Sequence, residues 1–169
     1  YGSNVVPRIA VTKAYDRLHF KLLASSAYRA PGLENLNLNE LARVKDPSLS
    51  EIQPEITDVY EVEVGYRLSE SVHTTVNLFD MRIHKPIVYA YDSFVEAESY
   101  RNFGNVGTQG AEFGMQLIED WGSLRLNYAY YQKVDSNAET YEVPQHDNSL
   151  LGFSQHQLSG QGNYRVSDA

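Results

Sequence analysis

The sequence predicts an all-β protein: an antiparallel, up-and-down transmembrane β-barrel segment of about seven strands, forming an open part of a larger barrel. Two observations support this fold class. Apolar and polar residues alternate in seven separate segments, as they do on strands with one apolar face. Short and long connections between these segments also alternate. A mean hydropathy of −0.44 is compatible with this fold, because a barrel strand needs an apolar residue only at every second position.

The first half of the chain contains four alternating segments. Their apolar positions are Val5, Pro7, Ile9 and Val11; Leu18, Phe20, Leu22 and Ala24; Tyr60, Val62, Val64, Tyr66 and Leu68; and Val72, Thr74, Val76 and Leu78. Leu23 interrupts the second segment. In the fourth, the apolar phase shifts to Phe79, Met81 and Ile83. This shift predicts either a β-bulge or the point where the strand leaves its apolar surroundings.

The second half contains three more segments. Their apolar positions are Ala111, Phe113, Met115 and Leu117; Leu124, Leu126, Tyr128 and Tyr130; and Leu158, Tyr164 and Val166, with Gly160 and Gly162 between the last three. The intervening positions are mostly polar, and they include Glu112, Gln116, Arg125 and Asn127. These segments therefore continue the two-faced pattern.

The connections differ in length in a regular way. Short polar turns follow the first, third and fifth segments, at Tyr15-Asp16-Arg17, Ser69-Glu70-Ser71 and Asp120-Trp121-Gly122. The links after the second, fourth and sixth segments are long, at 32–54, 90–101 and 135–154. Loops longer than about 15 residues are rare in compact soluble domains. Short turns at one end and long loops at the other are typical of a transmembrane barrel.

A soluble β-sandwich or a lipocalin-like barrel is the competing fold. Such a fold buries its apolar rows inward, whereas a large membrane barrel turns them outward. Alternation alone does not separate the two. The polar rows, with Glu61, Glu63, Arg67 and the Gln/Asn series of 155–165, suit a polar lumen, and this favours the membrane barrel.

Composition excludes several other classes. A formal net charge of −8 with only 14 Lys and Arg argues against nucleic-acid binding, which needs clustered cations. The absence of cysteine excludes disulfides, thiol catalysis and Cys-ligated metal. No apolar run approaches the roughly 20 residues of a transmembrane helix, so a helical membrane protein is excluded.

Four motifs resemble those of TonB-dependent outer-membrane receptors. Tyr28-Arg29-Ala30-Pro31 is similar to the aromatic-Arg-Ala-Pro box that closes a barrel strand in this family. Pro54-Glu55, followed by Glu61 and Gly65, resembles the family's Pro-Glu, spacer, Glu and Gly pattern. Asn102 and Gly104, followed by Gly110 and Glu112, resemble its Asn-x-Gly, spacer, Gly-x-Glu signature, and 151–158 resembles the stretch before a late strand. Each motif alone is weak, but the four occur in the family's order over roughly 5–165.

The resemblance implies part of a bacterial outer-membrane receptor that imports a scarce nutrient such as a ferric siderophore. Energy would come from a periplasmic TonB partner that acts on an N-terminal plug, and lipid would surround the barrel. Residues 1–169 are then expected to be a partial barrel, with the plug and the remaining strands absent. Two alternatives remain: a passive porin or small self-contained outer-membrane barrel, and a soluble ligand-binding β-domain.

The candidate site residues have plain structural interpretations. We expect Arg29 and Pro31 to end a strand at the rim, and Glu61, Glu63 and Glu112 to form ion pairs in the lumen. The expected partners are Arg67, Arg125 or the plug. A hydrated lumen lacks the water-excluding pocket that acid–base catalysis needs.

No metal site, cofactor or enzymatic activity is expected. His146-Asp147 with His156 lacks the spacing of a zinc site. No nucleophile elbow, metalloprotease helix or phosphate-binding loop occurs. The sequence thus offers no residues on which an enzyme could be proposed.

Tyrosines define the possible ligand vestibule. Tyr89 and Tyr91, and the cluster from Tyr128 to Tyr131, precede long loops. An interfacial aromatic girdle is the favoured interpretation. A vestibule containing Tyr89, Tyr91 and Tyr131 is the alternative.

The resemblance also limits the ligand. Haem receptors of the family carry a His between the aromatic-Arg-Ala-Pro box and a later Asn-Pro-x-Leu-like box. Here Asp46-Pro47-Ser48-Leu49 resembles the latter, and 32–45 contains no His. We therefore predict that haem is not the substrate. Siderophore, cobalamin, nickel chelate and oligosaccharide remain open.

Closure gives a further expectation. Bacterial single-chain barrels have even strand numbers, so about seven strands should form an open sheet with free edges near 5–12 and 157–166. Because unpaired strand edges and an apolar outer face promote association, the isolated chain should aggregate or need detergent.

Overall fold

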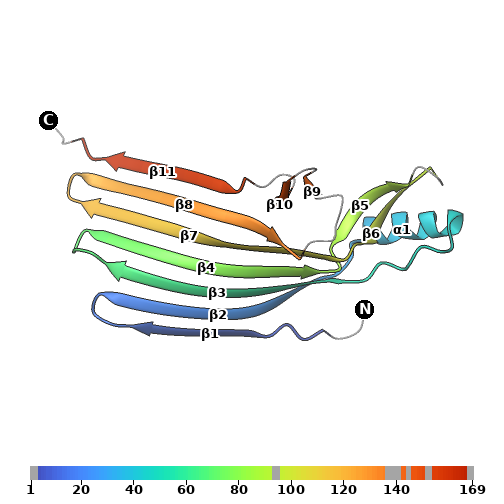
Figure 1. Cartoon of the computed structure of the whole chain (residues 1–169), viewed down its shortest axis with the longest axis horizontal. Helices are drawn as coiled ribbons and strands as arrows, with labels where there is room; N and C mark the ends of the chain where they lie inside the picture. Colours follow the sequence, from blue (N-terminus) through green and yellow to red (C-terminus); the bar gives the residue numbers. More distant parts are fainter. Residues whose placement is uncertain (1–3, 93–95, 136–141, 144–145, 151–153, 167–169) are drawn as a thin grey trace.

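Seven long strands form one antiparallel sheet in the computed structural model, which describes residues 4–92, 96–135, 142–143, 146–150 and 154–166 (Figure 1). In spatial order the strands are β1 (Arg8–Ala14), β2 (Leu18–Arg29), β3 (Glu55–Arg67), β4 (Val72–His84), β7 (Asn105–Glu119), β8 (Gly122–Val134) and β11 (His156–Tyr164). All neighbours pair antiparallel. Because the spatial order follows the sequence order, the predicted up-and-down topology is confirmed.

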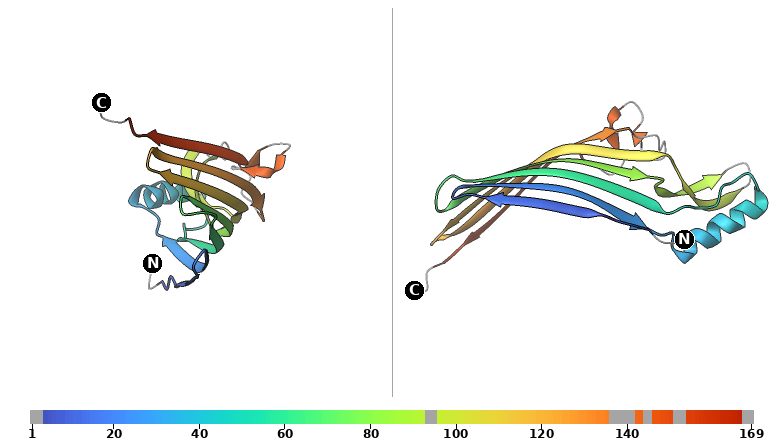
Figure 2. Two further views of the ribbon diagram at one scale, coloured as in Figure 1. Left: turned by 90° about the vertical axis from the view of Figure 1, so that its left-hand side faces the viewer. Right: turned by 90° about the horizontal axis from the view of Figure 1, so that it is seen from below.

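The sheet is open. β1 and β11 are its outermost strands, and within the described part of the chain no pairing joins them. Figure 2 shows that the sheet arches like a section of a barrel wall. The predicted open segment with these two edges is therefore confirmed, although β1 begins at Arg8 and not at Val5.

The long links carry secondary structure that the sequence pattern did not predict. Helix α1 (Leu33–Lys45) lies in the first link, and the hairpin of β5 (Ile87–Asp92) and β6 (Ala97–Asn102) lies in the second. β9 (Glu142–Val143) and β10 (His146–Leu150) pair in the third. We call this end of the sheet the loop end and the opposite end the turn end. In Figure 1, α1 and the β5–β6 hairpin project beyond the loop end.

Local signals explain the limits of α1. The Gly32 N–H donates to the Asn35 side-chain oxygen over 2.8 Å at the first turn. The Asp46 N–H donates to the Ala42 carbonyl at the last turn. Glu34 in the first turn and Lys45 in the last turn complement the helix dipole.

The two faces of the sheet differ as the alternation predicts. One face, which we call the outer face, presents large apolar side chains that are between 39% and 80% exposed; they include Ile9, Val11, Phe20, Leu22, Tyr60, Val62, Val76, Leu78, Phe113, Tyr128 and Leu158. The other face, the inner face, carries polar side chains. Among the described residues, the buried aliphatic side chains all lie at the loop end: Ala42, Ile52, Ile87, Val88 and Val106. Within the described part of the chain, the apolar outer face is therefore not covered by other protein segments.

The phase shift in β4 is not a bulge. Pairing with β3 and β7 runs without interruption as far as His84. Phe79 and Ile83 therefore lie on the inner face, whereas Asp80 and Arg82 take the outer positions beyond Leu78. This matches the second explanation offered by the sequence, in which the strand leaves its apolar surroundings at the loop end.

The described residues include one helix of substantial length, α1. It is neither long nor apolar enough to cross a membrane.

Candidate functional site

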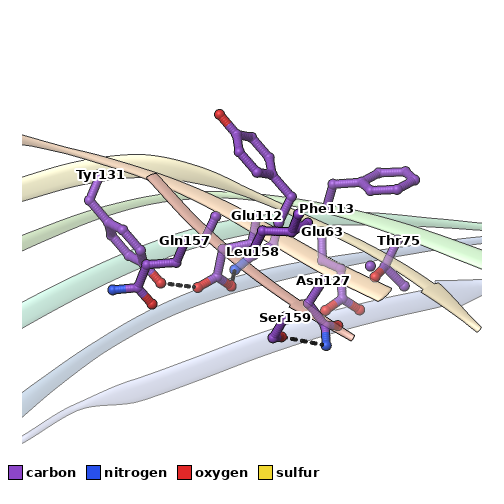
Figure 3. A pocket seen from close by; sticks show the side chains of 13 residues that line it. Glu63, Thr75, Glu112, Phe113, Asn127, Tyr131, Gln157, Leu158 and Ser159 are labelled. Carbon is purple, nitrogen blue, oxygen red and sulfur yellow. Dashed lines mark hydrogen bonds between the residues drawn. The ribbon is translucent and has the colours of Figure 1, made fainter. Parts of the chain in front are cut away.

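A polar hollow of about 430 Å³ occupies the inner face of the sheet. Its polar lining consists of Glu63 from β3, Thr75 and Asn77 from β4, Glu112 from β7, Asn127 and Tyr131 from β8, and Gln157 and Ser159 from β11. Strand alternation brings these residues to one side of five strands, because the pairing register holds them opposite one another. Figure 3 shows the Phe113 ring pointing away from the Glu112 carboxylate beside it.

Hydrogen bonds converge on Glu112 in this hollow. The Tyr131 hydroxyl donates to Glu112 Oε1 over 2.9 Å (Figure 3). Asn77 Nδ2 donates to Glu112 Oε2 over 3.4 Å. Asn77 Oδ1 is buried and accepts no hydrogen bond from the described residues. With two carboxylates and an unused amide oxygen, the hollow is rich in acceptors and suits a cationic or hydrogen-bond-donating group.

The other expected carboxylates pair with β2 and not with the arginines. His19 Nε2 lies 3.1 Å from Glu63 Oε1, and Lys21 Nζ lies 3.9 Å from Glu61 Oε2. Arg67 instead contacts Asp16 in the β1–β2 turn over 2.9 Å. Arg67, one of the three expected partners, is therefore engaged elsewhere, while Arg125 and the plug stay predictions. The β2–β3 register places His19 and Lys21 closer to the two glutamates, a relation that the sequence pattern alone does not reveal.

Gly65 makes the His19 contact possible. A Cβ atom at this position would lie 1.9 Å from His19 Cε1. The imidazole therefore lies flat over a position where only glycine fits. This gives the motif glycine a structural role.

Gly110 has a similar role on β7. A Cβ atom there would lie 2.7 Å from Phe79 Cζ and 2.1 Å from the Tyr130 carbonyl oxygen. Phe79 uses this space to pack against Tyr131, with ring centroids 5.3 Å apart. Gly110 and Glu112, two residues of one motif, thus support the same wall of the hollow.

Two motif residues far apart in sequence meet at the rim of the loop end. Arg29 Nη2 donates to Glu55 Oε2 over 2.7 Å and to the Ile87 carbonyl over 3.3 Å. The Ile87 N–H donates back to Glu55 Oε2 over 3.1 Å. In the same box, Pro31 is buried, Ala30 is exposed and Tyr28 is half-buried. The arginine and glutamate therefore anchor the β5–β6 hairpin to β2 and β3.

Asn102 makes a second rim contact. Its Oδ1 accepts from the Gln53 N–H over 2.5 Å, and its Nδ2 donates to the carbonyls of Gln53 and Lys85 over 2.9 and 2.7 Å. The Gly104 carbonyl accepts from the Lys85 N–H over 3.0 Å. Pro54, beside Gln53, is half-buried. Sequence reasoning identified Asn102 but gave no sign of its partner Gln53.

The candidate vestibule tyrosines separate into two places. Tyr89 and Tyr91 are exposed on β5, and the Tyr89 ring packs edge-on against Tyr100 with centroids 5.6 Å apart. Tyr131 lies in the hollow instead. The girdle interpretation does not fit Tyr89 and Tyr91, because β5 belongs to a separate two-stranded sheet. Tyr128 does lie on the exposed outer face.

The chemistry of Tyr89 depends on a neighbouring acid. A hydrogen bond with the Glu98 carboxylate is the main cause that raises the pKa of the Tyr89 phenol above its usual range. The phenol is therefore protonated at neutral pH. It can offer its ring and its polar O–H group to a ligand, but not a phenolate.

Metal ligation has little support in the described residues. They contain no group of three or more His, Cys, Asp or Glu that could hold a metal ion. The side chains of His146 and Asp147 lie outside the described residues. His156 Nδ1 is 2.8 Å from the Tyr128 hydroxyl on the outer face.

Three solved structures with a similar fold are much longer than this chain. The FrpB iron transporter from Neisseria meningitidis (F3-3 variant) matches with a TM-score of 0.59 and 16% identity over 78% of this chain and 20% of its own. The siderophore receptor PirA from Pseudomonas aeruginosa gives 0.62 and 17% over 77% and 25%. PirA from Acinetobacter baumannii gives 0.69 and 17% over 99% and 27%. The match therefore spans only between 20% and 27% of the length of these proteins.

Sequence comparison identifies the family directly. No curated protein matches the chain. The family model described as TonB dependent receptor-like, beta-barrel matches residues 1–168. Together with the open antiparallel sheet, this match shows that the chain belongs to the β-barrel family of TonB-dependent receptors.

Proposed function

We propose that this chain forms part of an outer-membrane receptor that imports a ferric siderophore or a similar ferric chelate, with energy from a periplasmic TonB partner. The observation that carries the proposal is the polarity of one sheet, which is apolar and exposed outside and polar and hollowed inside. This arrangement suits a barrel wall between lipid and a hydrated lumen.

The dimensions of the apolar zone support a membrane location. From the turn end towards the loop end, the outer positions of β4 run from Val72 to Leu78 before the first charged residue, Asp80. On the antiparallel β7 they run from Leu117 to Ala111 before the polar Gln109. The first and last of these seven residues are separated by six steps of roughly 3.3 Å, or about 20 Å along the strand. A strand tilt of about 40° reduces this to about 15 Å along the membrane normal, which covers part of the apolar band of about 25 Å on outer-membrane barrels.

The hollow supports binding and positioning in place of catalysis. Glu112 is held by Tyr131 and Asn77, and Glu63 is held by His19. These carboxylates line an open hollow on the inner face, which does not exclude water as an acid–base catalytic pocket does. We infer that they receive hydrogen-bond donors from the plug of the parent receptor, and that the chain is not an enzyme.

The ligand class rests on two observations. The named solved structures of similar fold are an iron transporter and two siderophore receptors. The segment 32–45, which would carry a haem-contacting His, contains none. Both favour a ferric chelate over haem.

Uptake by the full-length parent in cells tests this proposal. A deletion strain, a complemented strain and a TonB-deficient strain would receive radiolabelled ferric tris-catecholate, ferric tris-hydroxamate, cobalamin, nickel chelate, maltooligosaccharide and haem. We expect uptake of a ferric chelate that needs both the receptor and TonB. Uptake that persists without TonB, or receptor-dependent growth on haem as the sole iron source, would contradict the proposal.

A further inference from the structure

The first and second long links form one folded body at the loop end. Figure 1 shows α1 beside the β5–β6 hairpin. Ala42 of α1 and Ile52 are 1% exposed, Val88 of β5 is 4% exposed, and Ser99 of β6 is fully buried. Both links therefore contain buried residues, and α1 of the first lies against β6 of the second. We call residues 32–54 together with 85–102 the two-loop body.

A buried amide holds this body together from the helix side. Asn39 is 2% exposed, and its Nδ2 donates to the Ser50 carbonyl over 3.3 Å and to the Tyr100 carbonyl over 3.0 Å. The first bond closes the first link on itself. The second joins it to the hairpin, so one buried amide group donates to a backbone carbonyl in each link.

Asn102 holds the body at its stems. Gln53 directly precedes the Pro54-Glu55 motif, and Lys85 directly follows β4. The Asn102 amide pairs with the N–H and C=O of Gln53 as a neighbouring strand would, and its second donor reaches the Lys85 carbonyl. Because the amide provides both an acceptor and two donors, neither Asp nor Ala can reproduce these three bonds.

Further contacts fix the hairpin along its length. At the stem, Arg29 and Glu55 bind the carbonyl and N–H of Ile87. At the far end, Lys45 Nζ of α1 donates to the Glu96 carbonyl over 3.2 Å. The hairpin is thus tied to the other link at several points of its backbone.

We propose that these two loops act as a single recognition element for the ferric chelate, and that Asn102 is the positioning residue that holds them together. This inference rests on the proposed import function. The exposed rings of Tyr89 and Tyr91 provide the contact surface, which suits a chelate with aromatic or other flat apolar groups. Asn102 itself touches backbone and not ligand.

The first test measures the coupling of the loops without any ligand. Spin labels at Glu40 on α1 and Glu98 on β6, introduced as cysteines into the full-length receptor, report the distance between the links by pulsed electron resonance. Wild type should give one narrow distribution, and Asn102→Asp and Asn102→Ala should each broaden it. Asn163→Asp, the same chemical change at the turn end, is the matched control. A narrow distribution in both Asn102 variants would overturn the proposal.

The second test measures ligand binding by the same variants in detergent. The probes are the ferric complexes of a tris-catecholate and a tris-hydroxamate. Loss of the three bonds should weaken binding on the order of tenfold, mostly through faster dissociation. Asn102→Asp should be at least as severe as Asn102→Ala, because a carboxylate would face two carbonyl oxygens. Broadened distances with unchanged affinity would overturn the recognition role.

A rescue experiment separates positioning from general instability. Cysteines at Lys45 and Glu96, joined by a short bis-maleimide, should restore affinity in Asn102→Asp, whereas the same protein without cross-linker should stay weak. Failure of the cross-link to restore affinity would contradict the positioning role. If wild type binds neither probe, the proposed ligand class fails, while the distance measurement still decides whether the loops are coupled.

Discussion

The seven-stranded sheet and the two-loop body place their apolar side chains in opposite environments. On the outer face of the sheet, Leu78 is 53% exposed, whereas Ile52 and Val88 in the two-loop body are almost fully buried. Lipid can cover the first kind of surface, whereas a folded body in water must bury its apolar side chains internally. The same apolar residue types are therefore exposed in the sheet and buried in the two-loop body.

The polar groups of the two regions differ in a related way. In the sheet, backbone groups pair with one another along the ladders, which leaves side chains such as His19 and Glu63 to pair across strands. In the two-loop body, Asn39 and Asn102 bind backbone groups that have no ladder partner. The comparison indicates that asparagine amides replace strand pairing where the sheet ends.

The strongest test of the sheet side of this comparison introduces a charge on each face of β8. Leu126→Arg in the full-length receptor should cost roughly 2–4 kcal/mol of folding free energy in lipid, because Leu126 lies near the middle of the apolar zone. Asn127→Arg, on the inner face beside the hollow, should cost far less. Denaturant titration in lipid vesicles measures both, and equal losses would refute the face assignment.

The same substitution in each region gives the most direct comparison. Val88→Ala removes two buried methyl groups from the two-loop body and should destabilise it by about 2 kcal/mol. Val62→Ala on the outer face, where Val62 is 44% exposed, should have little effect in lipid. Hydrogen exchange of the β5–β6 amides should accelerate in the first variant only. Similar behaviour of both variants would remove the distinction between the two regions.

A smaller effect is expected where a glycine permits a pairing on the inner face. Gly65→Ala should displace the His19 ring and remove its bond to Glu63, at a cost of about 1 kcal/mol. His19→Ala should then make Gly65→Ala nearly neutral. Gly162→Ala, whose Cβ would lie 3.9 Å from the nearest atom outside its neighbours, is the control. Additive effects of the two changes would show that the His19 contact does not explain Gly65.

The smallest effect concerns ionisation on the hairpin. The raised pKa of Tyr89 means that its interaction with Glu98 is present below the ordinary tyrosine pKa and is lost as pH rises through the raised value. Glu98→Gln should therefore shift Tyr89 ionisation to lower pH. The ultraviolet difference spectrum against Tyr89→Phe isolates this transition, and an unchanged midpoint would contradict the role of Glu98.

The sequence by itself determined the strands, their order and their two faces. Period-two alternation in segments such as 60–68 specifies a strand with one apolar side, and short turns require neighbours to be antiparallel. Four motifs in order were enough to predict the family. The alternation, the turn lengths and the order of the motifs depend only on neighbouring residues or on their order along the chain, so the sequence is sufficient to identify them.

Only the tertiary structure decided which residues meet across the strands and loops. The pairing of Glu63 with His19 instead of Arg67 depends on the β2–β3 register, and the meeting of Arg29 with Glu55 depends on the ends of two strands. Helix α1 and the β5–β6 hairpin were missed because their stability comes from contacts with each other, such as Asn39 with Tyr100. Propensity within one short segment does not contain that information, since tertiary contacts supply most of the stability of short elements.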